Sequence, residues 1–158
     1  MKDRRGTHYG HKICLAGGAS NLVLDVRVEK GNPADSDLFR PMLERHVEIH
    51  GRAPRQVSAD GGFASKENLQ WTKAQGVQDC CLAKRRGIAI SDMVRSTWIY
   101  RKLKRFRAGI ESTISALKRA FGMGRCTWSG WEHFQRYVWS IVVSHKLFTM
   151  ARIRLAAD

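Results

Sequence analysis

The stretch FRAGIESTISALKRAFG, residues 106–122, decides how the rest of the chain is organised. Apolar side chains recur in it and just before it at intervals of three and four residues, which places them on one face of an α-helix. These residues are Leu103, Phe106, Ile110, Ile114, Leu117 and Phe121. We therefore predict a single helix here, with its apolar face turned toward the protein core.

Charged side chains lie beside this apolar face. At about 100° of rotation per residue, four of them follow one another along the border between core and solvent, in the order Arg107, Lys118, Glu111 and Lys104. The three cations would keep the Glu111 carboxylate ionised and oriented, as a metal ligand requires. The same spacing is typical of a simple salt bridge between Arg107 and Glu111, and ion-pair helices outnumber active sites. Both interpretations stay open at this point.

Composition and charge narrow the class of protein. The chain has 158 residues with 43% hydrophobic content, which suits one globular domain over residues 1–158. Its formal net charge is +14, with 28 Lys and Arg against 14 Asp and Glu, so we expect a polyanionic partner, nucleic acid by default. Residues 81–158 hold 16 of the basic and 4 of the acidic residues, so the binding face should be C-terminal. We expect no membrane span and no signal peptide, because no apolar run is long enough.

The N-terminal part predicts a β-hairpin followed by a helix. Residues 11–15 and 22–28 are β-prone, and the turn-forming sequence GGASN joins them. In the second run Leu22, Leu24, Val26 and Val28 alternate with Val23, Asp25, Arg27 and Glu29, which predicts a half-solvated antiparallel strand with Asp25 at the surface. Asp35 or Ser36 is the predicted cap of a helix that ends near residue 49.

The middle of the chain predicts a strand that ends in an acidic residue. Residues 55–59 are β-prone and lead directly into Asp60, Gly61 and Gly62. A carboxylate at the carboxyl end of a strand, followed by flexible glycines, projects into the crevice where α/β sheets bind ligands. A plain Asp-Gly turn is the alternative. We further predict a helix over residues 66–75 capped by Ser65, a strand over residues 77–83, and a long helix over residues 131–154.

Nine basic residues and one acid lie between residues 84 and 107, which is the strongest signal for a polyanion in the chain. The basic residues are Lys84, Arg85, Arg86, Arg95, Arg101, Lys102, Lys104, Arg105 and Arg107. Trp98, Tyr100 and Phe106 are interleaved with them and could stack on bases, although we expect at least Phe106 to pack in the core.

Three of these motifs together resemble DDE transposases of bacterial insertion sequences. The segment ADGGFAS, residues 59–65, resembles the family's second acidic residue, and FRAGIESTISALKR, residues 106–119, resembles its final glutamate helix. One branch of the family has Tyr, Arg, Glu and Lys separated by two, three and six residues. Arg107, Glu111 and Lys118 match that spacing, with Lys104 in place of the tyrosine. Residues 7–36 resemble the hairpin and the glycine-asparagine-proline turn that precede the second acid.

The resemblance implies a fold, a chemistry and a partner. The fold is α/β and ribonuclease H-like, a mixed five-stranded sheet flanked by helices. The chemistry is metal-assisted phosphoryl transfer, in which carboxylates hold two Mg²⁺ (or Mn²⁺) ions about 3.5 to 4 Å apart. Asp60 and Glu111 are then the catalytic and metal-binding residues. The partner is double-stranded DNA at the element ends and the target, bound by a possible homodimer in the bacterial cytoplasm. The DNA-binding residues are then Arg107, Lys118, Lys104, Lys84, Arg85, Arg86, Arg101, Lys102 and Arg105.

The resemblance also implies an acidic residue that we do not find. The family's first catalytic aspartate stands on a strand before the hairpin, whereas the residues before Tyr9 are too few and too polar to form one. Asp3 and Asp25 lie in the wrong context to replace it. We therefore expect the C-terminal portion of a transposase, lacking its first strand and catalytically impaired. A noncatalytic basic DNA-binding module and a ribonuclease H-like nuclease that cuts without joining remain alternatives.

Overall fold

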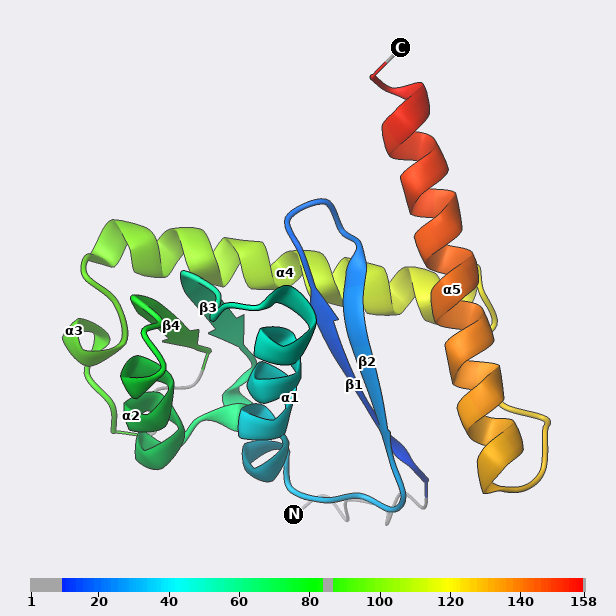
Figure 1. The fold of residues 1–158 in the computed structure, drawn as a ribbon, viewed down its shortest axis with the longest axis horizontal. Helices are drawn as coiled ribbons and strands as arrows, with labels where there is room; N and C mark the ends of the chain where they lie inside the picture. Colours follow the sequence, from blue (N-terminus) through cyan, green and yellow to red (C-terminus); the bar gives the residue numbers. More distant parts are fainter. Residues whose placement is uncertain (1–9, 84–86, 158) are drawn as a thin grey trace, which may run out of the picture.

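A long helix connects two small sheets in this molecule (Figure 1). The computed structural model describes residues 10–83 and 87–157. One sheet pairs strands β1 and β2 antiparallel, and the other pairs β3 and β4 parallel. The fold is thus α/β, as predicted, with the antiparallel and parallel pairs in separate sheets. No helix in the described part of the chain is long and apolar enough to cross a membrane.

The predicted hairpin is confirmed, but its face assignment is wrong. β1 (Lys12–Gly17) pairs with β2 (Val23–Glu29). The pairing moves from Asp25 to Val23 while the partner strand advances only from Ala16 to Gly17, so Leu24 is an extra residue in a β-bulge. A bulge reverses the alternation of side chains beyond it. Val23 therefore joins Val26 on the apolar face, where the simple alternation predicts Leu24.

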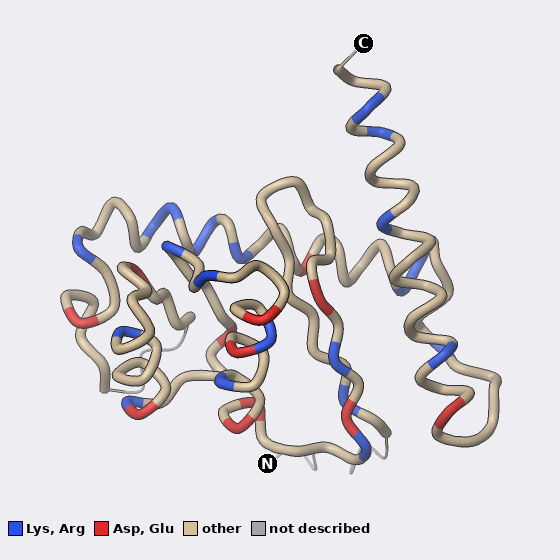
Figure 2. The backbone as a smooth tube through the Cα atoms, viewed as in Figure 1, with Lys and Arg blue, Asp and Glu red and all other residues tan. Residues whose placement is uncertain are grey.

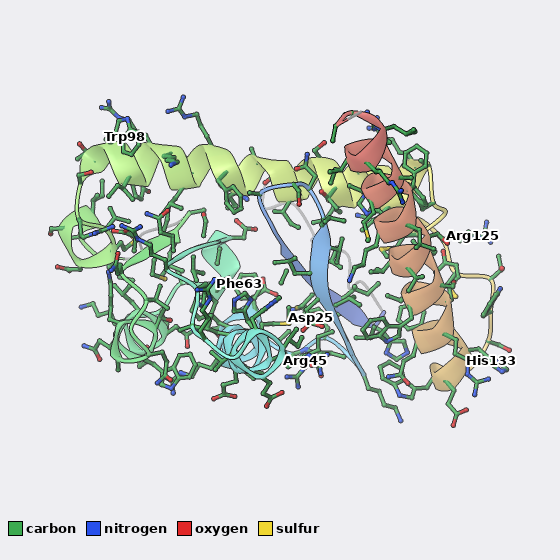
Figure 3. The ribbon with its side chains drawn as sticks, turned by 45° about the horizontal axis from the view of Figure 1, so that its top comes forward. Asp25, Arg45, Phe63, Trp98, Arg125 and His133 are labelled. Atoms are coloured by element: carbon green, nitrogen blue, oxygen red, sulfur yellow. The ribbon has the colours of Figure 1, made fainter. Side chains whose placement is uncertain are left out.

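Helix α1 (Asp35–His50) lies beside the hairpin (Figure 1), and a contact from its Arg45 makes the predicted surface position of Asp25 wrong. Asp25 is only 8% exposed. Its two carboxylate oxygens accept hydrogen bonds from Arg45 of α1, at 2.7 Å from Nε and 3.0 Å from Nη2. Figure 3 shows this pair between β2 and α1. The predicted cap is also wrong, because Ala34 is the N-cap residue and forms no side-chain cap.

The central segments follow the prediction closely. β3 (Gln56–Ala59) is followed by a short 3₁₀ helix η1 (Gly61–Phe63), then by α2 (Lys66–Ala74) and β4 (Asp79–Leu82). The Ser65 hydroxyl accepts a hydrogen bond from the Asn68 amide and caps α2, as predicted. Because β3 and β4 are parallel, their carboxyl ends, and with them Asp60, lie at one edge of the sheet.

Three helices complete the chain: α3 (Ile90–Met93), α4 (Thr97–Arg119) and α5 (Trp131–Leu155). α4 starts nine residues before the stretch that predicted it and belongs to both hydrophobic clusters of the protein. Leu103 packs in the cluster around β3 and β4, whereas Leu117 packs with β2 and α5 in the second. The core position predicted for Phe106 is wrong, because its side chain is 44% exposed. α4 therefore fixes the two sheets relative to each other.

Candidate active site

Asp60 lies where β3 ends, at the position that the sequence predicts. Its Oδ1 accepts a hydrogen bond of 2.7 Å from the Gly61 amide and so caps η1. The side chain remains 66% exposed. The carboxylate is thus anchored through one oxygen and still open to solvent and ligands.

The glycine at position 62 leaves room for α1 beside Asp60. A Cβ atom placed on Gly62 would lie 2.9 Å from Cγ and 3.0 Å from Cβ of Asp35, distances at which real carbon atoms overlap. Asp35 in turn forms a salt bridge of 2.8 Å with Lys12 of β1. The loop after β3 is therefore packed against the start of α1 and tied to the hairpin.

Contacts from both sheets hold α4 beside this loop. The Ser58 hydroxyl of β3 donates a hydrogen bond of 3.0 Å to the Leu103 carbonyl. Farther along α4, a Cβ atom on Gly109 would come within 3.2 Å of Asn21 Oδ1 in the hairpin turn, so the turn packs closely on the helix at this glycine. Glu111 follows two residues later and is consequently held at a fixed position relative to β3.

Arg107 brings the two predicted carboxylates together. Its Nη1 lies 2.7 Å from Glu111 Oε1 and 3.6 Å from Asp60 Oδ1. The two oxygens can be no farther apart than the sum of these distances. The Arg107 side chain is 20% exposed, whereas that of Glu111 is 61% exposed. The salt bridge that helical spacing predicts is therefore present, and it belongs to a three-residue cluster that the spacing alone could not indicate.

The basic residues predicted to bind DNA follow α4 (Figure 2). Lys104 and Lys118 are exposed on this helix, the first before Arg107 and the second after Glu111. Arg101, Lys102 and Arg105 are exposed in the N-terminal half of the same helix. Lys102 Nζ lies 5.3 Å from the centre of the exposed Trp98 ring, a cation–π contact. Lys84, Arg85 and Arg86 lie outside the described residues.

The carboxylates of the cluster are candidate ligands of a divalent cation. Within residues 10–83 and 87–157, no group of three or more His, Cys, Asp and Glu side chains could hold a metal ion. Asp60 and Glu111 do supply two exposed, convergent carboxylates. Mg²⁺ is commonly bound by one or two carboxylates together with waters and substrate phosphates. The pair therefore supplies the one or two carboxylates that such a cation takes from a protein.

Comparison with known proteins identifies the family. The family described as Transposase DDE domain matches residues 1–147. The chain belongs to the DDE transposase family. No curated protein and no solved structure matches it. This DDE domain therefore implies a protein that acts in DNA transposition, with DNA as its partner and a divalent metal as the family's usual cofactor.

Sequence reasoning missed the ion pair between Asp79 and Arg95, which links the start of β4 to the start of α4 in this DDE domain. Asp79, which is fully buried at the start of β4, accepts hydrogen bonds from Arg95 and from Gln56. These hydrogen bonds, those from the Arg95 side chain above all, hold the pKa of the Asp79 carboxyl well below its usual range. A lone acid in an otherwise apolar strand, DCCL, is the one signal that could have indicated a buried partner.

Proposed function

We propose that this DDE domain cleaves DNA strands and joins them to a target in a metal-dependent reaction, with Asp60 and Glu111 as its catalytic carboxylates. The observation that carries the proposal is the convergence of these residues, from the end of β3 and from α4, on one Arg107 guanidinium. Carboxylates gathered from separate elements at the edge of a sheet are well suited to phosphoryl transfer.

The proposed fold is ribonuclease H-like, with a further strand between the two sheets. Two-stranded sheets are marginally stable by themselves, and β1 and β3 are the inner strands of the two pairs (Figure 1). A strand paired with both would join them into one mixed sheet and would bring the family's first acidic residue to the edge where Asp60 lies. Among the described residues, Asp60 and Glu111 are the carboxylates at the site, so we expect weak metal binding and slow cleavage.

The residues of the chain have separate tasks in this proposal. Bound Mg²⁺ or Mn²⁺ would activate the attacking water or 3′-hydroxyl and stabilise the leaving oxygen. Asp60 and Glu111 hold the cation. The exposed cations of α4 bind phosphates on either side of the scissile bond, which positions the strand without reading its sequence. Two copies on paired DNA ends would then cut and join both ends together.

The experiment is nicking of a supercoiled plasmid in Mg²⁺ or Mn²⁺. Asp60→Asn and Glu111→Gln should reduce nicking to background while duplex affinity stays at or above that of the unsubstituted protein, because each change removes one negative charge. Glu132→Gln alters an exposed glutamate of α5 that pairs with Arg136, so it is a matched control and should nick normally. Unchanged nicking in both site variants would refute the assignment.

A second assay separates the proposed function from its alternatives. Labelled duplex ends are incubated with a target plasmid, and joined products are measured. A simple nuclease cuts the ends without joining them. Tight, salt-dependent binding with neither cutting nor joining would support the noncatalytic DNA-binding module, which the exposed cations of α4 also favour.

A further inference from the structure

The Arg107 guanidinium occupies the position between the two carboxylates that a divalent cation would need. One nitrogen atom, Nη1, contacts both Glu111 Oε1 and Asp60 Oδ1, at 2.7 and 3.6 Å. The inference drawn from this contact rests on the proposed function, because it concerns the same two carboxylates. It adds that the site carries its own competing cation.

The Arg107 side chain is largely buried, unlike the cation of an exposed ion pair. The Arg107 side chain is 20% exposed, and among the described residues its Nε atom is buried without a hydrogen-bond partner. An unpaired buried donor is unfavourable, so the guanidinium is incompletely satisfied in this arrangement. A phosphate oxygen could supply the missing acceptor, since guanidinium groups bind phosphates through two donors at once.

Electrostatics prevents the two cations from sharing the carboxylates in this geometry. A divalent ion held by Asp60 and Glu111 would lie within a few ångströms of Nη1, where charges of the same sign repel strongly even at a partly exposed site. The ion and the guanidinium must therefore separate. Arg107 lies on the rigid helix α4, so the separation would occur by rotation of its side chain.

We propose that Arg107 is an internal counter-ion that neutralises Asp60 and Glu111 until a divalent cation displaces it and frees its guanidinium for a DNA phosphate. Metal binding and DNA binding then strengthen each other, because the metal takes the two carboxylates and the DNA phosphate takes the guanidinium of the same ion pairs. In the absence of DNA, the cluster disfavours metal, which limits cleavage to the DNA-bound protein.

The first test is the affinity of the full chain for Mn²⁺, measured by electron paramagnetic resonance of the free ion. Arg107→Gln should bind Mn²⁺ at least about tenfold more tightly than the unsubstituted protein, because one nearby positive charge is removed. Arg107→Lys keeps that charge and should stay close to the unsubstituted protein. Arg136→Gln, at an exposed position of α5, is the control and should change the affinity less than twofold.

Addition of Asp60→Asn to Arg107→Gln should abolish the gain, which assigns it to this site. Equal or weaker Mn²⁺ binding by Arg107→Gln, or no measurable binding by any of these proteins, would overturn the proposal. If Arg107→Gln does not unfold cooperatively on heating, the Mn²⁺ affinity of Arg107→Lys is measured in its place. A tenfold gain in affinity by that charged variant would equally overturn the proposal.

The second test measures the coupling between Mn²⁺ binding and DNA binding. Duplex affinity is measured with and without Mn²⁺, and the ion should strengthen binding by the unsubstituted protein but not by Arg107→Gln. An equal gain in both proteins would contradict the displacement of Arg107. These outcomes can be told apart from failure of the proposed function, which fails if Asp60→Asn and Glu111→Gln leave nicking unchanged or if cut ends are not joined to the target.

Discussion

The ion pair between the buried Asp79 and the half-exposed Arg95 gives the sharpest stability prediction. Asp79 is 0% exposed, and Arg95 donates to it from Nη2 at 2.8 Å, from Nε at 3.3 Å and from its backbone amide at 3.0 Å. Gln56 adds a hydrogen bond of 2.9 Å. Since Asp79 begins β4 and Arg95 immediately precedes the N-cap of α4, the pair fixes the start of the helix that carries Glu111.

Arg95→Ala should cost about 3 kcal/mol of unfolding free energy, because it leaves a fully buried carboxylate with too few donors. Asp79→Asn should cost less, about 1 to 2 kcal/mol, because the half-exposed Arg95 side chain can return to water. Arg101→Ala removes an exposed arginine from α4 and should stay within about 0.5 kcal/mol. Urea unfolding followed by circular dichroism measures all three.

The pH dependence follows from the same pair. The folded-state pKa of Asp79 lies below the unfolded value, which is about 3.9. Its stabilisation is therefore complete above that value and is lost as the pH falls toward the folded-state pKa. Asp79→Asn should lack this loss on acidification. An Arg95→Ala cost below about 1 kcal/mol, or one smaller than that of Asp79→Asn, would refute the reasoning.

Three further predictions concern the packing around the site. Leu117→Ala should cost about 3 to 4 kcal/mol in urea unfolding, because this fully buried side chain joins α4 to β2 and α5. Gly62→Ala should cost about 1 to 3 kcal/mol through overlap with Asp35, and addition of Asp35→Ala should recover part of that cost, a coupling that a double-mutant cycle measures. Burial raises the pKa of the Cys80 thiol to about 12, so at pH 8 an alkylating reagent followed by mass spectrometry should label the partly exposed Cys126 well before Cys80.

Most secondary structure could be predicted from the sequence because its signals are local. The Ser65 hydroxyl caps α2 through a residue three positions away, and the apolar spacing around Leu117 is a property of one helix. The β-prone run of residues 55–59 likewise placed Asp60 at the end of its strand, and the apolar spacing of residues 103–121 placed Glu111 on its helix. The role of Asp60 and Glu111 in catalysis stays a prediction, as does DNA binding by the cations of α4.

The wrong predictions for β2, Asp25 and Phe106 share a cause, since each depends on contacts between distant segments. A bulge opposite Gly17 reversed the alternation of β2, and α1 then covered Asp25 and supplied Arg45 as its partner. Phe106 fits the apolar face by periodicity and is nevertheless 44% exposed, because it packs in neither hydrophobic cluster.

The sequence by itself determined most of the helices and strands, the basic character of the C-terminal half and the family motifs, because periodicity, capping and charge act over a few residues. Only the tertiary structure decided that Arg107 contacts Asp60 as well as Glu111. Helical spacing fixes the second contact, whereas the first requires α4 to lie against the end of β3. That placement results from the packing of Leu103 and Leu117 in two separate clusters, which no local pattern specifies.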